Sequence, residues 1–289
     1  MPGPLLTIDG PFVLYRSFFA LPDSITDGDG HAVNALLGAA NLILRIAADC
    51  RPRAIVVCFG AEAAAYRTDL YPAYHADRPP VPDALDWQFA RAPDLFGAFG
   101  WTTADTDDLE ADDLLGALAE AEVDAGGRAL IMTGDRDMYQ CAGERVSVVF
   151  LKQKSAGFDE VDPAEVKARY GVVPSLVPDF IALRGDPSDG LPGAPGIGPK
   201  TAAELLDRYG SLEAVIAAAD EQRPRIAASL RDNADELLAF RDIATLRPAQ
   251  VALPADAETN LDGGAVAARA LGMNRLAERL ENASSLADL

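Results

Sequence analysis

The chain has 289 residues, of which 49% are hydrophobic, and its 25 basic and 45 acidic side chains give a formal net charge of -20. This length and composition predict a globular protein of one large or two modest domains, and they exclude a disordered chain and, with no run near about 18 apolar residues, a membrane span. Taken alone, the acidic charge argues against unguided attraction to nucleic acid or to anionic membranes.

Short apolar runs alternate with helical patterns over the first half of the chain. The apolar runs cover 5–8, 54–59, 129–132 and 146–151, and the helical patterns cover 33–50 and 111–125. Such an alternation predicts an α/β fold in which helices flank a mostly parallel, twisted sheet. Residues 71–83 hold four of the 20 prolines, so we expect this stretch to leave the sheet as an excursion.

The pattern changes after about residue 170, where the strand-like runs stop. A turn rich in glycine and proline at 185–198 is followed by helical patterns over 199–208, 211–219 and 223–244. We therefore expect an α/β domain over 1–170, a helical region over 171–250 and a tail that carries little signal over 251–289.

Two features of the sequence bear on the cellular compartment, namely the N-terminus and the cysteines. The N-terminus has no basic segment followed by a long apolar run, so no signal peptide is expected. Cys50, Cys58 and Cys141 lie far apart and without metal-ligand spacing, which is typical of reduced thiols in a cytoplasmic protein.

Acidic side chains follow the predicted strands at their carboxyl ends, where functional groups gather in open parallel sheets. Asp9 follows the first run, and Asp135 and Asp137 follow the third. Further acids open the helical pattern at 111–125 or lie in the glycine-rich turn, namely Glu110, Asp112, Asp113, Asp186 and Asp189. Helix caps explain one or two of these acids well, but not the whole set.

Carboxylates gathered in this way repel one another unless cations bridge them. Hard oxygen ligands suit Mg²⁺ or Mn²⁺ rather than zinc, and the chain has only two histidines. We therefore predict a two-metal site, with ions about 3.5–4 Å apart that clamp the attacking and leaving oxygens of a phosphoryl displacement. The spacing alone leaves open the alternative that the acids are unrelated caps and turns.

A glycine turn leads into a helix at Gly196-Ile197-Gly198-Pro199-Lys200-Thr201-Ala202. Pro199 suits the first helical position, where its missing N–H does no harm. The glycines let backbone N–H groups face a phosphate at the helix N-terminus, and Lys200 adds positive charge. The segment predicts a helix-hairpin-helix element, which grips a DNA backbone without reading its sequence.

Taken together, these segments resemble the 5′ nuclease (flap endonuclease) family, and especially the 5′→3′ exonuclease domain of bacterial DNA polymerase I. The motifs that carry the resemblance are, in chain order, Ile8-Asp9-Gly10 with Tyr15-Arg16, Leu109–Asp113, Thr133–Gln140, Gly185–Gly193 and Gly196–Ala202. The resemblance implies a helical arch over the active site near 66–100 and a DNA-binding hairpin region. No polymerase domain follows, so we expect a free-standing nuclease.

The activity implied by the resemblance is hydrolysis of phosphodiesters at 5′ flaps, nicks or gaps in DNA, including removal of RNA primers. The products would carry 5′-phosphate and 3′-hydroxyl ends. The first metal would generate the attacking hydroxide and would be held by Asp9, Glu110 and Asp112. The second metal would be placed, directly or through water, by Asp113, Asp135, Asp137, Asp186 and Asp189.

The resemblance also implies contacts with the substrate. Arg16 would contact a substrate phosphate, Arg78 would stabilise charge on the scissile phosphate, and Tyr74 would stack on a frayed base or pack within the arch. The hairpin residues expected to bind DNA are Gly196, Gly198, Lys200 and Thr201, with a monovalent cation such as K⁺ at the hairpin loop.

Two positions depart from the family pattern. The family usually has Tyr-Lys-x-x-Arg in the arch, and His75 replaces the lysine here; it could donate a hydrogen bond if protonated, although a neutral imidazole is the default near pH 7. The family commonly has Phe-Asp after the second strand, and here it is Phe59-Gly60. We therefore expect weaker binding of the first metal, with water or Glu62 at the vacant position.

These departures leave alternatives to the nuclease. One is a structure-specific DNA-binding protein with weakened or lost catalysis, although a pure binder would gain nothing from carboxylates that repel DNA. Another is a metal-dependent RNase or phosphatase on a similar α/β core, which the hairpin after residue 190 disfavours.

The acidic charge is concentrated in one part of the chain. Residues 77–125 contain 13 acids and two bases, which account for -11 of the -20. We therefore expect DNA to be bound through a few local cations, and weakly without divalent metal. The expected partners are DNA with a 5′ flap, nick or gap and RNA–DNA primer junctions. The resemblance favours a monomer associated with the bacterial nucleoid, and leaves open its recruitment by a DNA polymerase or sliding clamp.

Overall fold

A computed structural model describes residues 3–152 and 157–289 of the chain. Its centre is a six-stranded sheet with the strand order β3-β2-β1-β4-β5-β6. The strands are β1 (Leu5–Asp9), β2 (Ala54–Cys58), β3 (Thr102–Ala104), β4 (Ala129–Thr133), β5 (Val146–Leu151) and β6 (Phe158–Val161). The first five are parallel and β6 pairs with β5 in the antiparallel direction, so the prediction of a mostly parallel sheet is confirmed.

The edge strands β3 and β6 were not predicted from the sequence. β3 has three residues, and β6 has two acids among its four. Edge strands this short and polar have no apolar run to mark them, because each is covered on one side only.

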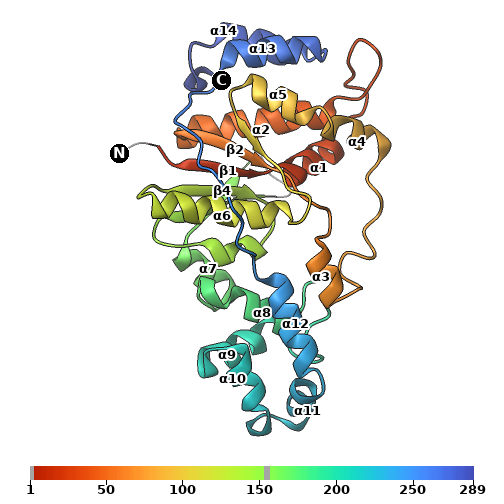
Figure 1. The fold of residues 1–289 in the computed structure, drawn as a ribbon, viewed down its shortest axis with the longest axis vertical. Helices are drawn as coiled ribbons and strands as arrows, with labels where there is room; N and C mark the ends of the chain where they lie inside the picture. The colour runs from red at the N-terminus through yellow and green to blue at the C-terminus, as the bar shows by residue number, and fades with distance from the viewer. Residues whose placement is uncertain (1–2, 153–156) are drawn as a thin grey trace.

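Helices cover both faces of the sheet (Figure 1). On one side lie α1 (Gly10–Ala20), α2 (Asn34–Cys50) and α5 (Ala92–Ala98), and on the other lies α6 (Ala111–Asp124). Successive side chains of a strand point to opposite faces. Accordingly, Leu6 and Ile8 of β1 pack in the core with α2 and α5, whereas Leu5 packs in the core with α6.

Residues 163–244 form a helical region below the sheet in Figure 1. Its helices are α7 (Pro163–Tyr170), α8 (Val177–Arg184), α9 (Pro199–Tyr209), α10 (Leu212–Ala217), α11 (Pro224–Asp232) and α12 (Ala234–Ala244). The helix predicted over 223–244 is two helices, which meet at Asn233. Short 3₁₀ helices follow β4 (Asp137–Cys141) and α7 (Pro174–Leu176), and two others are Ala219–Glu221 and Leu286–Asp288.

The segment expected as an arch, 66–100, contains α3 (Ala65–Leu70), α4 (Asp83–Phe89) and α5. Residues 71–82 between α3 and α4 are turns and extended chain, not helix, because four prolines remove backbone donors there. In Figure 1 this stretch runs along one side of the molecule, from the helical region up to the layer that contains α1.

Residues 251–289, which carried little signal as a sequence, include α13 (Leu261–Ala270) and α14 (Asn274–Asn282). These helices return to the layer of α2 and α5, where Leu276 and Leu280 are buried. On the way the Ala257 N–H donates to the Arg53 carbonyl at 2.8 Å. The C-terminal segment is thus part of the α/β core. No helix in the described ranges is long and apolar enough to cross a bilayer.

Candidate active site

A cavity of about 1190 Å³ opens at the carboxyl ends of the parallel strands. Seven of the predicted carboxylates line it, namely Asp9, Glu110, Asp112, Asp135, Asp137, Asp186 and Asp189. The predicted strand ends, helix start and glycine-rich turn therefore meet at one site, as expected for an open parallel sheet.

Asp9 and Asp135 are brought together by the pairing of β1 with β4. Ile8 lies opposite Met132 in this register, so the two strands end side by side. Asp9 caps α1 by accepting from the Phe12 N–H at 2.9 Å, and it also accepts from the Thr133 hydroxyl at 2.7 Å. Asp135 accepts from the Asp137 N–H at 2.8 Å. Both oxygens of Asp9 and the loop after β4 are thereby held in place by hydrogen bonds.

The turn after α8 carries Asp186 and Asp189 to the same cavity. The backbones of Asp186 and Leu191 exchange two hydrogen bonds of 2.8 Å, which close the turn. Asp186 accepts from Arg184 Nη2 at 2.8 Å, and Asp189 accepts from Arg78 Nη2 at 3.1 Å. Both acids that the helical region contributes to the site are therefore already paired with cations.

Burial and mutual repulsion raise the pKa values of four of the other acids, Asp9, Asp112, Asp135 and Asp137. Burial raises the pKa of Asp9, and burial followed by repulsion from Asp135 and Asp9 raises the pKa of Asp112 well above its usual range. Burial and the charge of Asp189 raise the pKa of Asp135 to about 7. The pKa of Asp137 is likewise raised well above its usual range, first by burial and then by Asp135.

Within residues 3–152 and 157–289 these four acids form no ion pair, whereas Asp186 and Asp189 each do. In addition, Asp137 Oδ1 is buried without a hydrogen-bond partner. A buried carboxylate oxygen without a partner is costly unless a cation compensates it. Clustered, buried oxygen ligands of this kind fit hard divalent cations such as Mg²⁺ and Mn²⁺.

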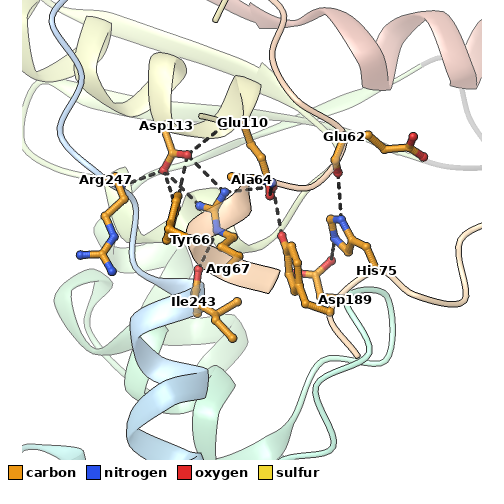
Figure 2. A network of polar contacts seen from close by, with 12 residues as sticks. Glu62, Ala64, Tyr66, Arg67, His75, Glu110, Asp113, Asp189, Ile243 and Arg247 are labelled. Carbon is orange, nitrogen blue, oxygen red and sulfur yellow. Dashed lines mark hydrogen bonds and ion pairs between the residues drawn. The ribbon is translucent and has the colours of Figure 1, made fainter. Parts of the chain in front are cut away.

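Asp113 lies apart from the other predicted ligands. It is fully buried outside the cavity lining, and it accepts from Arg67 Nη1 at 3.2 Å and Arg67 Nη2 at 3.0 Å. It also accepts from the Arg247 N–H at 2.7 Å (Figure 2). Because consecutive helical residues point about 100° apart, Asp112 faces the cavity and Asp113 faces this network. The surroundings of Asp113 are those of a structural ion pair.

Glu110 belongs both to the cavity lining and to the network around Arg67. It lines the cavity, yet one oxygen accepts from the Ala64 N–H at 2.8 Å and the other lies 3.0 Å from Arg67 Nη1 and accepts from the Tyr74 hydroxyl at 3.0 Å (Figure 2). Glu110 therefore joins α6 to the segment that begins with α3.

Tyr74 and His75 are held in the wall of the cavity. Tyr74 is 5% exposed and stacks on the His75 ring, with centroids 3.8 Å apart, which favours the predicted packing role over stacking on a frayed base. His75 lies between the Glu62 carbonyl, 2.9 Å from Nδ1, and Asp189, 3.1 Å from Nε2 (Figure 2). Both ring nitrogens of His75 are thus engaged within the protein.

Gly60 is required by close packing. A Cβ at this position would lie 2.7 Å from the Leu109 carbonyl oxygen and 2.7 Å from the Ala111 nitrogen. Glu62, the expected substitute ligand, lines the cavity, but its side chain is exposed and points away from Glu110 in Figure 2. The backbone at the start of α6 therefore occupies the space that an aspartate at position 60 would need.

The remaining predicted residues lie outside the cavity lining. Arg16 Nη2 donates to the Lys152 carbonyl at 2.6 Å, on the side of β5. The hairpin residues lie at the start of α9: Gly196 has a φ of +86° in the turn, and the Lys200 side chain is 90% exposed, with Glu204 3.9 Å away. Gly198 and Thr201 flank them. The hairpin is a separate surface of the helical region.

Sequence reasoning missed the residues that neutralise or orient these acids. Arg67 contacts acids more than 40 positions away along the chain, and Thr133 donates to Asp9 from 124 positions away. No local motif marks such contacts. Arg184 is the exception, since it lies two residues before Asp186.

Two models of one family match consecutive parts of the chain. The model described as 5′-3′ exonuclease, N-terminal resolvase-like domain matches residues 4–171, and the model described as 5′-3′ exonuclease, C-terminal SAM fold matches residues 172–263. The 5′-3′ exonuclease of Mycobacterium tuberculosis is 38% identical over 251 residues, which cover 80% of this chain and 78% of that protein.

DNA polymerase I of Mycobacterium tuberculosis is 35% identical over 243 residues, covering 84% of this chain. The chain spans only 27% of the length of that polymerase. Among solved structures, T5 5′-exonuclease with bound zinc has a TM-score of 0.67 at 16% identity, covering 96% of this chain and 98% of that one. The catalytic core of Rad2 with DNA substrate has a TM-score of 0.61 at 14% identity, covering 97% and 92%. These two structures share the fold.

Proposed function

Because the chain belongs to the 5′-3′ exonuclease family, we propose that it is a structure-specific nuclease that hydrolyses phosphodiesters at 5′ flaps, nicks or gaps in DNA. Removal of RNA primers is part of the same activity, and the products carry 5′-phosphate and 3′-hydroxyl ends. The observation that carries the proposal is the wall of seven carboxylates in one cavity, four of which form no ion pair within residues 3–152 and 157–289. Such a wall repels DNA unless metal ions are bound to it.

The residues divide into two ligand groups. Asp9, Glu110 and Asp112 would hold one Mg²⁺ or Mn²⁺ ion, and Asp135, Asp137, Asp186 and Asp189 would hold the other, directly or through water. When bound, such ions supply hydroxide near neutral pH and neutralise charge on the reacting phosphate. Solved structures of the same fold are described with zinc and with DNA and metal ions, which supports divalent cations in general.

Arg78 is the cation best placed to bind the reacting phosphate. Its side chain is 41% exposed at the cavity and donates one N–H to Asp189. A guanidinium has five N–H donors, so several stay available for phosphate oxygens. His75, with both ring nitrogens engaged, orients Asp189 instead of donating to the substrate.

The hairpin would bind the duplex backbone away from the cavity. Lys200 is exposed in the first turn of α9, which follows Gly196 and Gly198, and a K⁺ ion at this loop would bridge protein and phosphate. We further propose that a DNA polymerase or a sliding clamp recruits the protein to DNA in the bacterial cytoplasm. The similarity to DNA polymerase I supports a partnership with a polymerase.

A DNA-binding protein with weakened catalysis is the second candidate. Two observations favour it: position 60 has no room for a carboxylate, and His75 has no free donor in place of the usual lysine. The seven carboxylates that still line the cavity favour the nuclease.

One assay separates the candidates. Labelled 5′-flap DNA, single-stranded RNA and a phosphomonoester are each incubated with Mg²⁺, Mn²⁺ or EDTA. The nuclease predicts cleavage of the flap with a divalent ion only. Stable binding of the flap without cleavage in any metal would establish the second candidate, and cleavage of RNA or the monoester alone would contradict both.

A further inference from the structure

The cations that line the cavity differ in whether an acid already neutralises them. They are Arg67, His75, Arg78, Arg136, Lys152 and Arg184. Arg67 pairs with Glu110 and Asp113, His75 and Arg78 pair with Asp189, Lys152 pairs with Asp159, and Arg184 pairs with Asp186. Within residues 3–152 and 157–289, Arg136 alone among the six forms no ion pair.

Arg136 lies in the loop after β4, between Asp135 and Asp137, and its side chain is exposed. Its guanidinium carbon is 5.7 Å from the ring centroid of Phe150, a residue of β5 that also lines the cavity. Arg78 and His75 reach the cavity from the stretch that follows β2 and α3, whereas Arg136 reaches it beside β5. Arg136 therefore reaches the cavity beside Phe150, whereas Arg78 and His75 contact Asp189 of the turn after α8.

On the basis of the proposed nuclease function, we propose that Arg136 binds a backbone phosphate of the nucleic acid strand on the β5 side of the carboxylates. A guanidinium matches two phosphate oxygens with parallel N–H donors. Since Arg136 breaks no ion pair when it binds, its whole charge is available to the phosphate. The contact of its guanidinium with the Phe150 ring is a cation–π attraction that favours this side of the cavity.

This role predicts opposite effects on DNA and on metal. Arg136 adjoins two candidate metal ligands, so its positive charge repels a divalent ion there. Removing the charge should therefore weaken DNA binding while leaving metal binding equal or tighter. An arginine that only held the loop in shape would weaken both when removed.

The test compares Arg136→Gln with Lys152→Gln, which removes the same charge from a lining residue that is already paired with Asp159. Affinity for 5′-flap DNA is measured by fluorescence anisotropy in EDTA at low salt, and KM and kcat are measured with Mg²⁺. For Arg136→Gln we expect Kd and KM to rise roughly tenfold with little change in kcat. The slope of log Kd against log salt should fall by about 1, and Arg136→Lys should recover part of the affinity.

Three results would overturn the proposal. They are an unchanged Kd in Arg136→Gln, an equal loss in Lys152→Gln, or a higher Mg²⁺ requirement for thermal stabilisation of Arg136→Gln. Failure of the proposed function gives a different pattern: wild-type protein that binds the flap without cutting it contradicts the nuclease, while the Kd comparison still decides the role of Arg136. Wild-type protein that binds no flap DNA would overturn both.

Discussion

Asp112 and Asp113 are neighbours in the chain but serve different parts of the molecule. Asp112 lines the carboxylate cavity, whereas Asp113 is buried outside its lining and accepts from both terminal nitrogens of Arg67, at 3.2 and 3.0 Å. Since Arg67 also donates to the Ile243 carbonyl at 3.0 Å, Asp113 helps to join α6 to α3 and α12.

Replacing these two acids should therefore have different consequences. Asp112→Asn should reduce cleavage by at least ~100-fold and leave the melting temperature equal or higher, because it removes a charge that Asp135 and Asp9 repel. Asp113→Asn leaves Arg67 without half of its charge compensation and should destabilise the fold by about 3 kcal/mol. Thermal unfolding and flap cleavage on the same preparations measure both effects. Equal melting temperatures with equal loss of cleavage would instead place both acids on metal.

Metal binding should release protons near neutral pH. Burial and nearby acids raise the pKa of Asp135 from 3.8 to about 7, so its neutral form stabilises the metal-free fold. That contribution is fully present below the unfolded pKa and is lost as the pH rises through about 7. We expect Mg²⁺ to raise the melting temperature little at pH 6 and clearly at pH 8, in scans at matched ionic strength. Asp135→Asn should flatten this dependence; a metal effect that is independent of pH contradicts it.

Gly60 should not accept the aspartate that the family commonly has. Both Gly60→Ala and Gly60→Asp place a Cβ 2.7 Å from backbone atoms of Leu109 and Ala111, which should cost about 1–3 kcal/mol in stability. Gly97→Ala in α5 is the control, because a Cβ there meets nothing within 4 Å and should be neutral or stabilising. Urea unfolding of the three variants measures the difference. A Gly60→Asp protein that is as stable as the wild type and needs less Mg²⁺ would contradict this prediction. It would show that the backbone of Leu109 and Ala111 can move to make room for the side chain.

Lys200 should contribute to DNA affinity and not to chemistry. Its side chain is 90% exposed and its contact with Glu204 is 3.9 Å long, so little is lost when it turns to a phosphate. Lys200→Gln should raise KM for flap DNA several-fold, roughly 3–10-fold, with unchanged kcat and a salt slope smaller by about 1. Lys167→Gln, which removes an exposed lysine paired with Asp207 at 3.1 Å, is the control. Indistinguishable KM values for the two variants would show that Lys200 does not contribute to DNA binding.

The C-terminal helices should stabilise the α/β core. Leu280 in α14 is fully buried, so Leu280→Ala should lower the free energy of unfolding by about 2–5 kcal/mol. Val266 in α13 is 72% exposed, and Val266→Ala should change it by less than about 0.5 kcal/mol. Equal unfolding midpoints in urea would mean that α13 and α14 unfold separately from the core.

Much of the fold followed from the sequence because its signals are local. The apolar runs that became β1, β2, β4 and β5 have the length and composition of buried strands. The acids that follow β1 and β4 and those of the glycine-rich turn meet in one cavity, because parallel strands end at a common edge. The short edge strands β3 and β6 and the helices α13 and α14 were missed, since they are defined by what they pack against.

The sequence by itself determined the family, the α/β sheet, the carboxylates of the cavity and the hairpin turn, all of which depend on residue type and spacing along the chain. Only the tertiary structure decided which acids and cations are already paired. In the tertiary structure Asp113 pairs with Arg67, His75 contacts Asp189, backbone atoms fill the space beside Gly60, and Arg136 forms no ion pair with the described residues. Ion pairs and steric contacts act over a few ångströms, and the chain brings together residues that are tens of positions apart.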